Sequence, residues 1–233
     1  MRTLPRIVAC VTLSCISASA LAEDTSATLQ RLFEDERAFL WRADPLTATY
    51  DGVCEYDYRL PSDTPASQDQ RLQADQGFLQ RLHGIDRAAL TPQEQVSYDL
   101  FDFMVTQRIA LARHREWRAP LNSDSGFHAD VLQMHEAANP RTVQDYERYI
   151  ARLNDLPRYF DENIANMREG VRDGFTLPAE VLEGVSSIVA AEQFETAEAC
   201  PLYRPFADFP VTVPQADRTR LAAAGRAAIE QSV

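Results

Sequence analysis

The residues whose chemistry is easiest to recognise are His135 and Glu136, because a His-Glu-x-x-His helix places two zinc-binding imidazoles on one face beside a catalytic Glu. Here the second histidine position holds Asn139, and Pro140 ends the segment. His128 lies two helical turns before His135 and can share its face, but that is a poor spacing for metal ligands. The pattern therefore predicts ordinary surface or capping histidines and no zinc site.

Other catalytic motifs are also missing from the sequence. There is no Gly-x-Ser-x-Gly turn, and a chain without lysine cannot contain Ser-x-x-Lys or a Gly-x-x-x-x-Gly-Lys phosphate loop. Carboxylate pairs are plentiful, but in a chain of formal net charge −12 we expect them on solvated helix faces. The sequence thus shows no complete catalytic site. The same acidic charge argues against nucleic acid and anionic lipid as partners.

The N-terminus has the pattern of a signal peptide. Arg2 and Arg6 precede an uncharged, mostly apolar run that closes with Ala20-Leu21-Ala22. Small residues at these positions are typical of a signal peptidase site, so we expect cleavage near Ala22 and a periplasmic or secreted protein. No later stretch reaches the roughly 20 apolar residues of a membrane span. We therefore assign residues 1–22 to the signal and residues 23–233 to the mature chain.

Two cysteines, Cys54 and Cys200, remain after the signal is removed. In an oxidising compartment they can form one disulfide that closes a long loop. Two separate thiols are the alternative, because the sequence does not give the distance between the two Cα atoms.

Scarce glycine and a hydrophobic period near 3.6 residues predict an all-α fold, a multi-helix array with proline-marked turns and little or no strand. An irregular connection is expected at 45–65, a polar loop at 120–128 and an extended, proline-rich segment at 201–214. Pro157 should kink or break the fourth predicted helix. The predicted helices cover 25–42, 66–83, 91–117, 142–170, 179–192 and 217–232.

The helix at 91–117 has the clearest start signal. Thr91 can cap it, Pro92 suits its first position, and Glu94 completes a capping box. We expect one apolar stripe of this helix to be its buried face, formed by Val96, Leu100, Phe103, Met104, Ile109 and Leu111.

The last predicted helix stops at Val233 without a closing glycine or proline. This is the ending that we expect if the chain is cut within a helix.

Several motifs together resemble one family, the bacterial "domain of unknown function 885". They run in order through most of the mature chain and comprise Leu121–His128, Thr142–Tyr149, Pro157–Phe160, Met167–Pro178, Pro201–Phe206 and Ala224–Ile229. Members of that family are generally longer, exported, helical proteins that resemble zinc metallopeptidases. Their metal site, a His-Glu helix with a further His, lies in a C-terminal half that nothing in this sequence matches.

The resemblance implies that this chain corresponds to the N-terminal part of such a protein. Zinc is implied for the full-length relatives and no cofactor for this chain. Its partners would be a peptide substrate or a missing C-terminal half, and residues that contact substrate could still be present. The candidates for lining a cleft are Asn122, Ser123, Asp124, His128, Tyr203 and Arg204.

Within this set, Arg204 could pair with a substrate carboxylate. In the alternative interpretation, the polar residues at 122–124 cap the following helix and Arg204 pairs with an acidic neighbour.

Three functional hypotheses follow. In the first, the chain is part of a zinc-peptidase-like protein and is inactive alone. In the second, it is a non-enzymatic periplasmic helical module that binds a peptide or another subunit. The third, a complete hydrolase, would need a site that the motifs do not show.

Overall fold

The computed structural model describes the backbone of residues 9–233 and the side chains of residues 24–233. The signal-peptide prediction for residues 1–22 concerns side chains outside this part and stays a prediction. The all-α prediction is confirmed, since helices and short 3-10 turns make up the regular structure of the described residues. Their β pairing is limited to one isolated bridge, between Leu121 and Gly126. The chain forms two compact units, 1–39 with 70–113 and 40–69 with 114–233.

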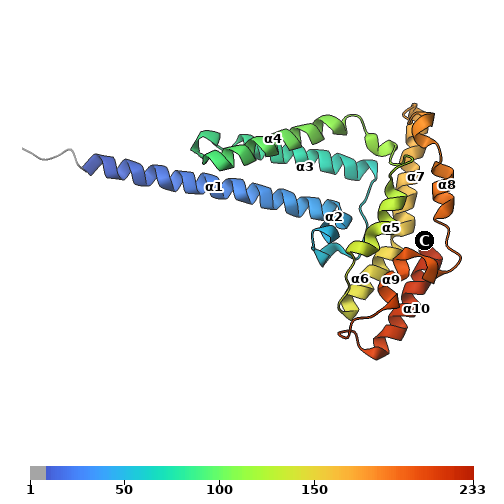
Figure 1. Cartoon of the computed structure of the whole chain (residues 1–233). Helices are drawn as coiled ribbons and strands as arrows, with labels where there is room; N and C mark the ends of the chain where they lie inside the picture. Colours follow the sequence, from blue (N-terminus) through green and yellow to red (C-terminus); the bar gives the residue numbers. More distant parts are fainter. Residues whose placement is uncertain (1–8) are drawn as a thin grey trace, which may run out of the picture. The chain divides into compact units, whose positions relative to one another are not determined.

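The first unit consists of three helices that run alongside one another (Figure 1): α1 (Ala9–Ala43), α3 (Pro65–His83) and α4 (Pro92–Ala112). The last residues of α1, 40–43, and the first residues of α3, 65–69, belong to the second unit. The core of the first unit is apolar, and the rings of Phe33 and Phe101 lie 5.0 Å apart within it. Its buried members are Leu29, Leu32, Phe78, Leu82, Ile85 and Leu90.

One cation joins the three helices of the first unit. The Arg108 guanidinium on α4 donates to Asp75 on α3 at 2.8 Å and to Glu36 on α1 at 2.8 Å. Both carboxylates are mostly buried. Because buried charges need partners, this triad restricts how the three helices can rotate about their axes.

The capping box at the start of α4 is confirmed, but the predicted buried face of this helix is wrong. Thr91 accepts the N–H of Glu94, and the Glu94 carboxylate accepts the N–H of Thr91. Val105 is fully buried instead, and Tyr98 and Phe101 pack on the core. The predicted stripe is exposed over most of its length: Val96, Leu100, Phe103, Met104 and Leu111 are exposed, and Ile109 is half-buried.

The second unit contains α2 (Pro45–Tyr50), α5 (Phe127–Ala137), α6 (Val143–Asn154), α7 (Leu156–Asp173), α8 (Val185–Ala191), α9 (Arg204–Ala207) and α10 (Gln215–Ser232). Its core is rich in aromatic side chains from α5, α6, α7 and α9. Thr142 and Asp145 form a capping box at the start of α6. The break predicted at Pro157 is confirmed, since α6 ends at Asn154 and α7 begins at Leu156.

Three other boundaries differ from the prediction. The helix expected to reach residue 117 ends at Ala112, and Arg115 beyond it has a left-handed backbone. Gly184, with φ 83°, divides the helix expected at 179–192 into a 3-10 turn and α8. The segment expected to be extended at 201–214 begins instead with a 3-10 turn and α9.

A buried arginine on α6 holds the first segment of the second unit in place. Arg152 is 1% exposed, and burial lowers its pKa. Its guanidinium donates to four backbone or hydroxyl oxygens and lies 3.3 Å from the carboxylate of Asp57. The four acceptors are Pro45 O, Thr49 Oγ1, Tyr56 O and Arg59 O. Two short stretches that lack a long helix, α2 and the 3-10 turn at Cys54–Tyr56, therefore depend on one side chain for their position.

The segment that follows is held in the same manner by α7 and the residue before it. The carboxylate of Asp155 accepts the N–H of Leu60 at 2.8 Å, and Glu162 accepts the N–H of Asp63 at 2.8 Å. The amide of Asn166 donates to Asp63 O at 2.6 Å. Buried backbone groups that no helix satisfies are thus satisfied by polar side chains.

Close packing of α10 depends on a glycine. A Cβ added at Gly225 would lie 2.5 Å from two ring atoms of Phe206. That ring is buried and packs against Tyr146, Tyr149 and Tyr203. The helix can therefore approach this aromatic cluster only where it has no side chain.

We predict that Arg152→Ala lowers the free energy of unfolding of the second unit by about 3 kcal/mol, because it removes a buried cation that donates to four oxygens and pairs with the Asp57 carboxylate. Arg152→Lys should recover only part of the loss, since an ammonium cannot reach all these acceptors. Both tryptophans, Trp41 and Trp117, lie in this unit, so urea unfolding followed by tryptophan fluorescence measures it. An unchanged midpoint in the alanine variant would contradict the assigned role.

We also predict that Gly225→Ala destabilises the second unit by about 1–2 kcal/mol, because crowding against Phe206 outweighs the better helix propensity of alanine. The matched control is Gly77→Ala on α3, where a Cβ would meet nothing within 4 Å. That variant should not lower stability. Thermal unfolding by circular dichroism compares the two, and equal effects would show that the approach of Phe206 is unimportant.

Candidate functional site

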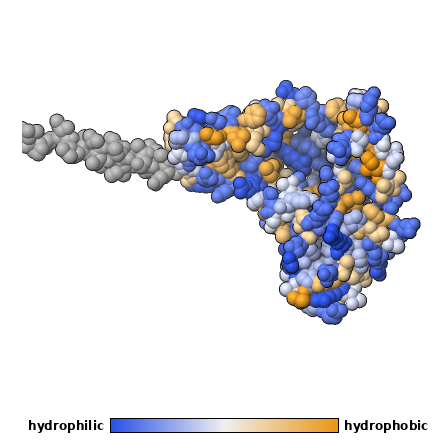
Figure 2. All heavy atoms as spheres, viewed as in Figure 1, coloured by the Kyte–Doolittle hydropathy of each residue, from blue (hydrophilic) through white to orange (hydrophobic). Residues whose placement is uncertain are grey.

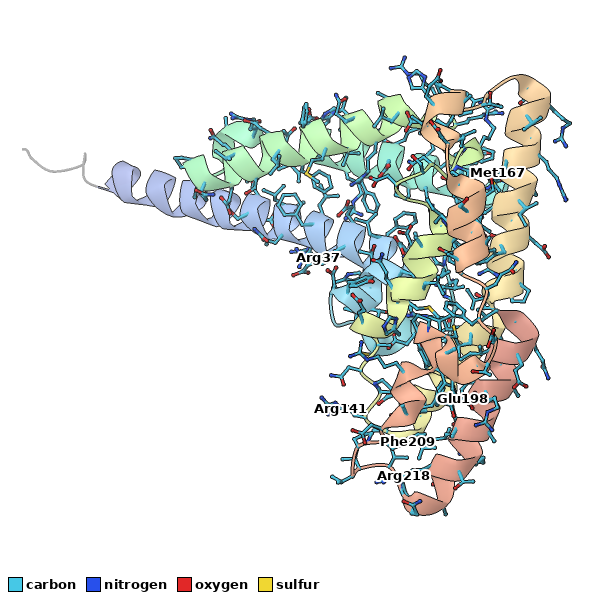
Figure 3. The ribbon with its side chains drawn as sticks, turned by 45° about the vertical axis from the view of Figure 1, so that its right-hand side comes forward. Arg37, Arg141, Met167, Glu198, Phe209 and Arg218 are labelled. Carbon is cyan, nitrogen blue, oxygen red and sulfur yellow. The ribbon has the colours of Figure 1, made fainter. Side chains whose placement is uncertain are left out.

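A pocket of about 530 Å³ lies within the second unit, between the end of α5, the start of α6 and the segment around α9. We call it the Arg141–Arg204 pocket. It has two guanidinium groups, an imidazole and two carboxylates, from Glu136 and Asp208, around an aromatic wall. Figure 3 labels Arg141 and Phe209, whose side chains lie in the same part of this unit.

The backbone of Arg141 is held on both sides. Its N–H donates to the Asp145 carboxylate at 3.1 Å, and its carbonyl accepts the hydroxyl of Thr212. The residue therefore leaves the α5–α6 connection in a defined direction. In the part of the chain whose side chains are described, the guanidinium of Arg141 has no hydrogen bond or ion pair.

Arg204 is positioned by the other side of the pocket. The hydroxyl of Tyr146 on α6 donates to Pro205 O at 2.9 Å, which fixes the first turn of α9. Phe209 stacks on the Tyr146 ring with centroids 4.7 Å apart. The Arg204 side chain is exposed, and it too has no hydrogen bond or ion pair among the described side chains.

His135 adds a third nitrogen-bearing side chain to the pocket lining. Its Nδ1 lies 2.7 Å from Leu132 O, and a carbonyl can only accept. Nδ1 therefore carries the proton, which makes Nε2 the acceptor in the neutral ring.

This arrangement suits a small zwitterionic or carboxylate-bearing ligand. Two guanidinium groups at one pocket can bind a carboxylate through paired, charge-assisted hydrogen bonds. The carboxylates of Glu136 and Asp208 offer acceptors for an amine or amide N–H, and they disfavour a ligand with several negative charges. Burial, followed by the charge of Asp208, raises the pKa of Tyr146, so its hydroxyl stays protonated.

The residues do not fit a zinc ion. Among the described side chains, no group of three or more His, Cys, Asp or Glu residues could hold a metal. His128 and His135 line two different pockets, and the proton of His135 Nδ1 is already engaged.

His128, a predicted site residue, lies instead at a second, largely apolar pocket of about 340 Å³. Its side chain is 7% exposed, with Nε2 3.7 Å from the Glu192 carboxylate and Nδ1 buried without a hydrogen bond. The ring edge packs on Phe127. The structure therefore separates His128 from Arg204, and the two do not line one pocket.

The turn at 121–126 uses its polar groups for its own structure. Asn122 Oδ1 accepts the N–H groups of Asp124 and Ser125 at 2.7 and 2.8 Å. The N–H of Ser123 donates to Val181 O at 2.9 Å. The alternative in which residues 122–124 cap the following helix is therefore not what the structure shows. Asn122 Oδ1 closes a turn before α5, and no side chain caps α5 itself. The predicted candidates Asn122, Ser123 and Asp124 line neither of the two pockets described above.

Tyr203 is a buried member of the aromatic core and not a pocket residue. Of the six predicted contact residues, Arg204 alone lies at the Arg141–Arg204 pocket. Sequence reasoning missed Arg141, His135 and Phe209 as parts of this site. Pro140 next to Arg141 and Pro210 next to Phe209 were the available signals, because both mark chain turns where side chains reach the surface.

The two cysteines are separate thiols in this structure, Cys54 exposed and Cys200 buried. The alternative of two separate thiols, without a disulfide between them, therefore describes this structure. Burial raises the pKa of both thiols, which disfavours the reactive thiolate form.

No helix in the described part of the chain has the length and apolar character needed to cross a bilayer.

Comparison with known families gives one match. The family model described as a bacterial protein of unknown function, DUF885, matches residues 45–233. No curated protein matches the chain. The match covers more than half of the chain and includes every residue of the Arg141–Arg204 pocket.

We predict that Asn122→Ala loosens the 121–126 turn and costs about 1 kcal/mol, because two N–H groups lose their acceptor. Asp124→Ala is the matched control, since the side chain of Asp124 is exposed and makes no hydrogen bond in the described part of the protein. Amide hydrogen exchange of residues 123–126 should rise in the first variant only. Equal exchange in both would show that Asn122 does not organise the turn.

Proposed function

The chain belongs to the bacterial DUF885 family, and from this premise we propose that it is an exported helical module that binds the C-terminal carboxylate of a peptide in the Arg141–Arg204 pocket. It does so without cleaving the peptide on its own. The observation that carries the proposal is the presence of two guanidinium groups at one pocket, both without an acidic partner among the described side chains.

Arg141 and Arg204 stand out because both guanidinium groups lie at one pocket. Acidic residues outnumber basic ones by 35 to 23, and some surface arginines pair with a carboxylate, as Arg220 and Arg226 do. Two cations that stay unpaired at the same concave site retain their capacity to bind an anion. A planar carboxylate matches the fork of a guanidinium better than a spherical ion does.

The rest of the pocket favours a peptide over a simple anion. The aromatic wall of Tyr146 and Phe209 can pack against an apolar side chain. Glu136 and Asp208 can accept backbone N–H groups of the ligand. A volume of about 530 Å³ is in the usual range of small-ligand sites and holds a few residues of a peptide.

The resemblance to zinc metallopeptidases supplies the ligand class, a peptide, and the signal-like residues 1–22 support export. Neither requires that this chain perform the chemistry.

Binding is tested with the peptide N-acetyl-Ala-Ala-Phe carrying a free carboxylate, compared with the same peptide as its amide, by isothermal titration calorimetry. We expect the free acid to bind at least about ten-fold more tightly, the difference of about 1.4 kcal/mol that one charge-assisted interaction provides. Arg204→Ala and Arg141→Ala should each remove this preference. Arg172→Ala is the control, because Arg172 is exposed, outside the pocket and in the same unit.

Equal affinity for acid and amide, or a loss in the Arg172 variant equal to that in the pocket variants, would refute the proposed site. Zinc content and peptidase activity of the same preparation test the second half of the proposal. Stoichiometric zinc with cleavage that a chelator abolishes would show that the chain is an enzyme with a site of its own.

A further inference from the structure

The largely apolar pocket of about 340 Å³ in the second unit contains one buried imidazole, that of His128. We call it the His128 pocket. Its walls come from α5, α7 and α8 and include Leu132, Phe160 and Val189. Val189 is 44% exposed although it lines the pocket, and Figure 2 shows hydrophobic residues (orange) at the surface over α7 and α8. Apolar surface at this wall is therefore left for a ligand to cover.

The imidazole of His128 is 94% buried by residue, since the residue is 6% exposed, and neither ring nitrogen has a hydrogen bond among the described residues. Nδ1 is buried and faces the turn before α5, because a Cβ added at Gly126 would lie 3.1 Å from it. Nε2 lies 3.7 Å from the carboxylate of Glu192, which also lines the pocket. That separation is too long for a hydrogen bond. A buried polar ring normally has its partners, so the nitrogen beside the pocket calls for one.

The surroundings of the ring decide which of its nitrogens carries the proton. In the neutral ring one nitrogen donates and the other accepts. A proton on Nδ1 would be a buried donor with no acceptor among the described residues, whereas a proton on Nε2 points toward the Glu192 carboxylate. We therefore assign the proton to Nε2. The pocket then presents one N–H donor and one carboxylate acceptor, with the nitrogen and the oxygen 3.7 Å apart.

A hydroxyl group matches this donor and acceptor, because one hydroxyl both accepts and donates a hydrogen bond. Its oxygen can lie about 2.8 Å from the His128 nitrogen and from the Glu192 oxygen at once, since these two atoms are closer than twice that distance. A ligand carboxylate would be repelled by Glu192. An ammonium group has only donors and would leave the N–H of His128 without an acceptor.

The rest of the pocket suits an apolar body that contains a ring. Benzene fills an apolar cavity of roughly 150 Å³, so a pocket of about 340 Å³ holds a ring with a short substituent. Phe160 offers an aromatic surface for such a ring, and it already packs edge-on against Phe127. Gln193 and Ser232 also border the pocket, but Gln193 is exposed and the Ser232 hydroxyl donates to Asn154 Oδ1.

We propose that the His128 pocket binds a small phenol, with the phenol hydroxyl between His128 Nε2 and the Glu192 carboxylate and the ring against Phe160. The hydroxyl accepts from Nε2–H and donates to the carboxylate. The second of these hydrogen bonds is charge-assisted and therefore the stronger. This site is independent of peptide binding, because the His128 pocket and the Arg141–Arg204 pocket share no lining residue.

The first experiment is isothermal titration calorimetry of the chain with para-ethylphenol and with para-ethylanisole, whose methyl ether accepts but cannot donate. We expect the phenol to bind at least about ten-fold more tightly than the ether, and more tightly than para-ethylbenzylamine. Glu192→Ala should remove the preference for the phenol over the ether. Glu192→Gln should only reduce it, since an amide oxygen still accepts but carries no charge.

Glu195→Ala is the matched control for the loss of one carboxylate. Glu195 is exposed, follows Glu192 by three positions and does not line the His128 pocket. This variant should keep the preference for the phenol in full.

The proton position is tested without any variant, by proton–nitrogen correlation NMR of the His128 ring. We expect the proton on Nε2 in the free chain and a shift of the Nε2–H resonance when para-ethylphenol is added. Equal affinity for phenol and ether, tighter binding of the amine, a preference that survives Glu192→Ala, or a proton on Nδ1 would each overturn the proposal. Peptide binding at the Arg141–Arg204 pocket is measured with a different ligand and different variants, so the two proposals fail or succeed separately.

Discussion

The buried guanidinium of Arg152 joins α6 to residues 45–59 of the second unit. A positive charge that is 1% exposed is tolerated only when its N–H donors find hydrogen-bond acceptors inside the protein. Here the acceptors come from residues 45–59, a stretch with only one and a half turns of α-helix and a 3-10 turn. The acceptors of this segment surround the cation, and the cation joins the segment to α6. Asp155, Glu162 and Asn166 extend the same arrangement along residues 60–63.

At the Arg141–Arg204 pocket, in contrast to Arg152, the backbone is held by hydrogen bonds while the guanidinium groups are left unpaired among the described side chains. Its framework is satisfied by hydrogen bonds: Asp145 and Thr212 hold the backbone of Arg141, and Tyr146 holds the start of α9. The guanidinium groups at its rim, by contrast, have no acidic partner in the described part of the molecule. A rigid backbone with unpaired charged ends lowers the entropic cost of binding, since the ligand does not have to order the site first.

The sequence predicted the helices and their ends better than their faces. Thr91 and Thr142 mark boundaries because capping is a local property of a few residues. Helix α4 shows the limit, since it is apolar on two sides. The stripe of Leu100 and Phe103 and the stripe of Phe101 and Val105 have the same period, so periodicity could not tell which one faces the core. The pocket was missed for a related reason: Arg141 and Arg204 are 63 positions apart, and nothing local connects them.

The division into units also determines the order in which the chain can fold as it is made. The first unit is discontinuous, with residues 40–69 of the second unit between α1 and the α3–α4 hairpin. Leu29 and Leu32 are therefore synthesised well before Phe78 and Leu82, which cover them. Until then α1 presents an uncovered apolar stripe, a state that chaperones bind and that aggregates readily. Export in an unfolded state would remove this interval, because all the segments of the first unit would then reach their compartment before any of them has to pack.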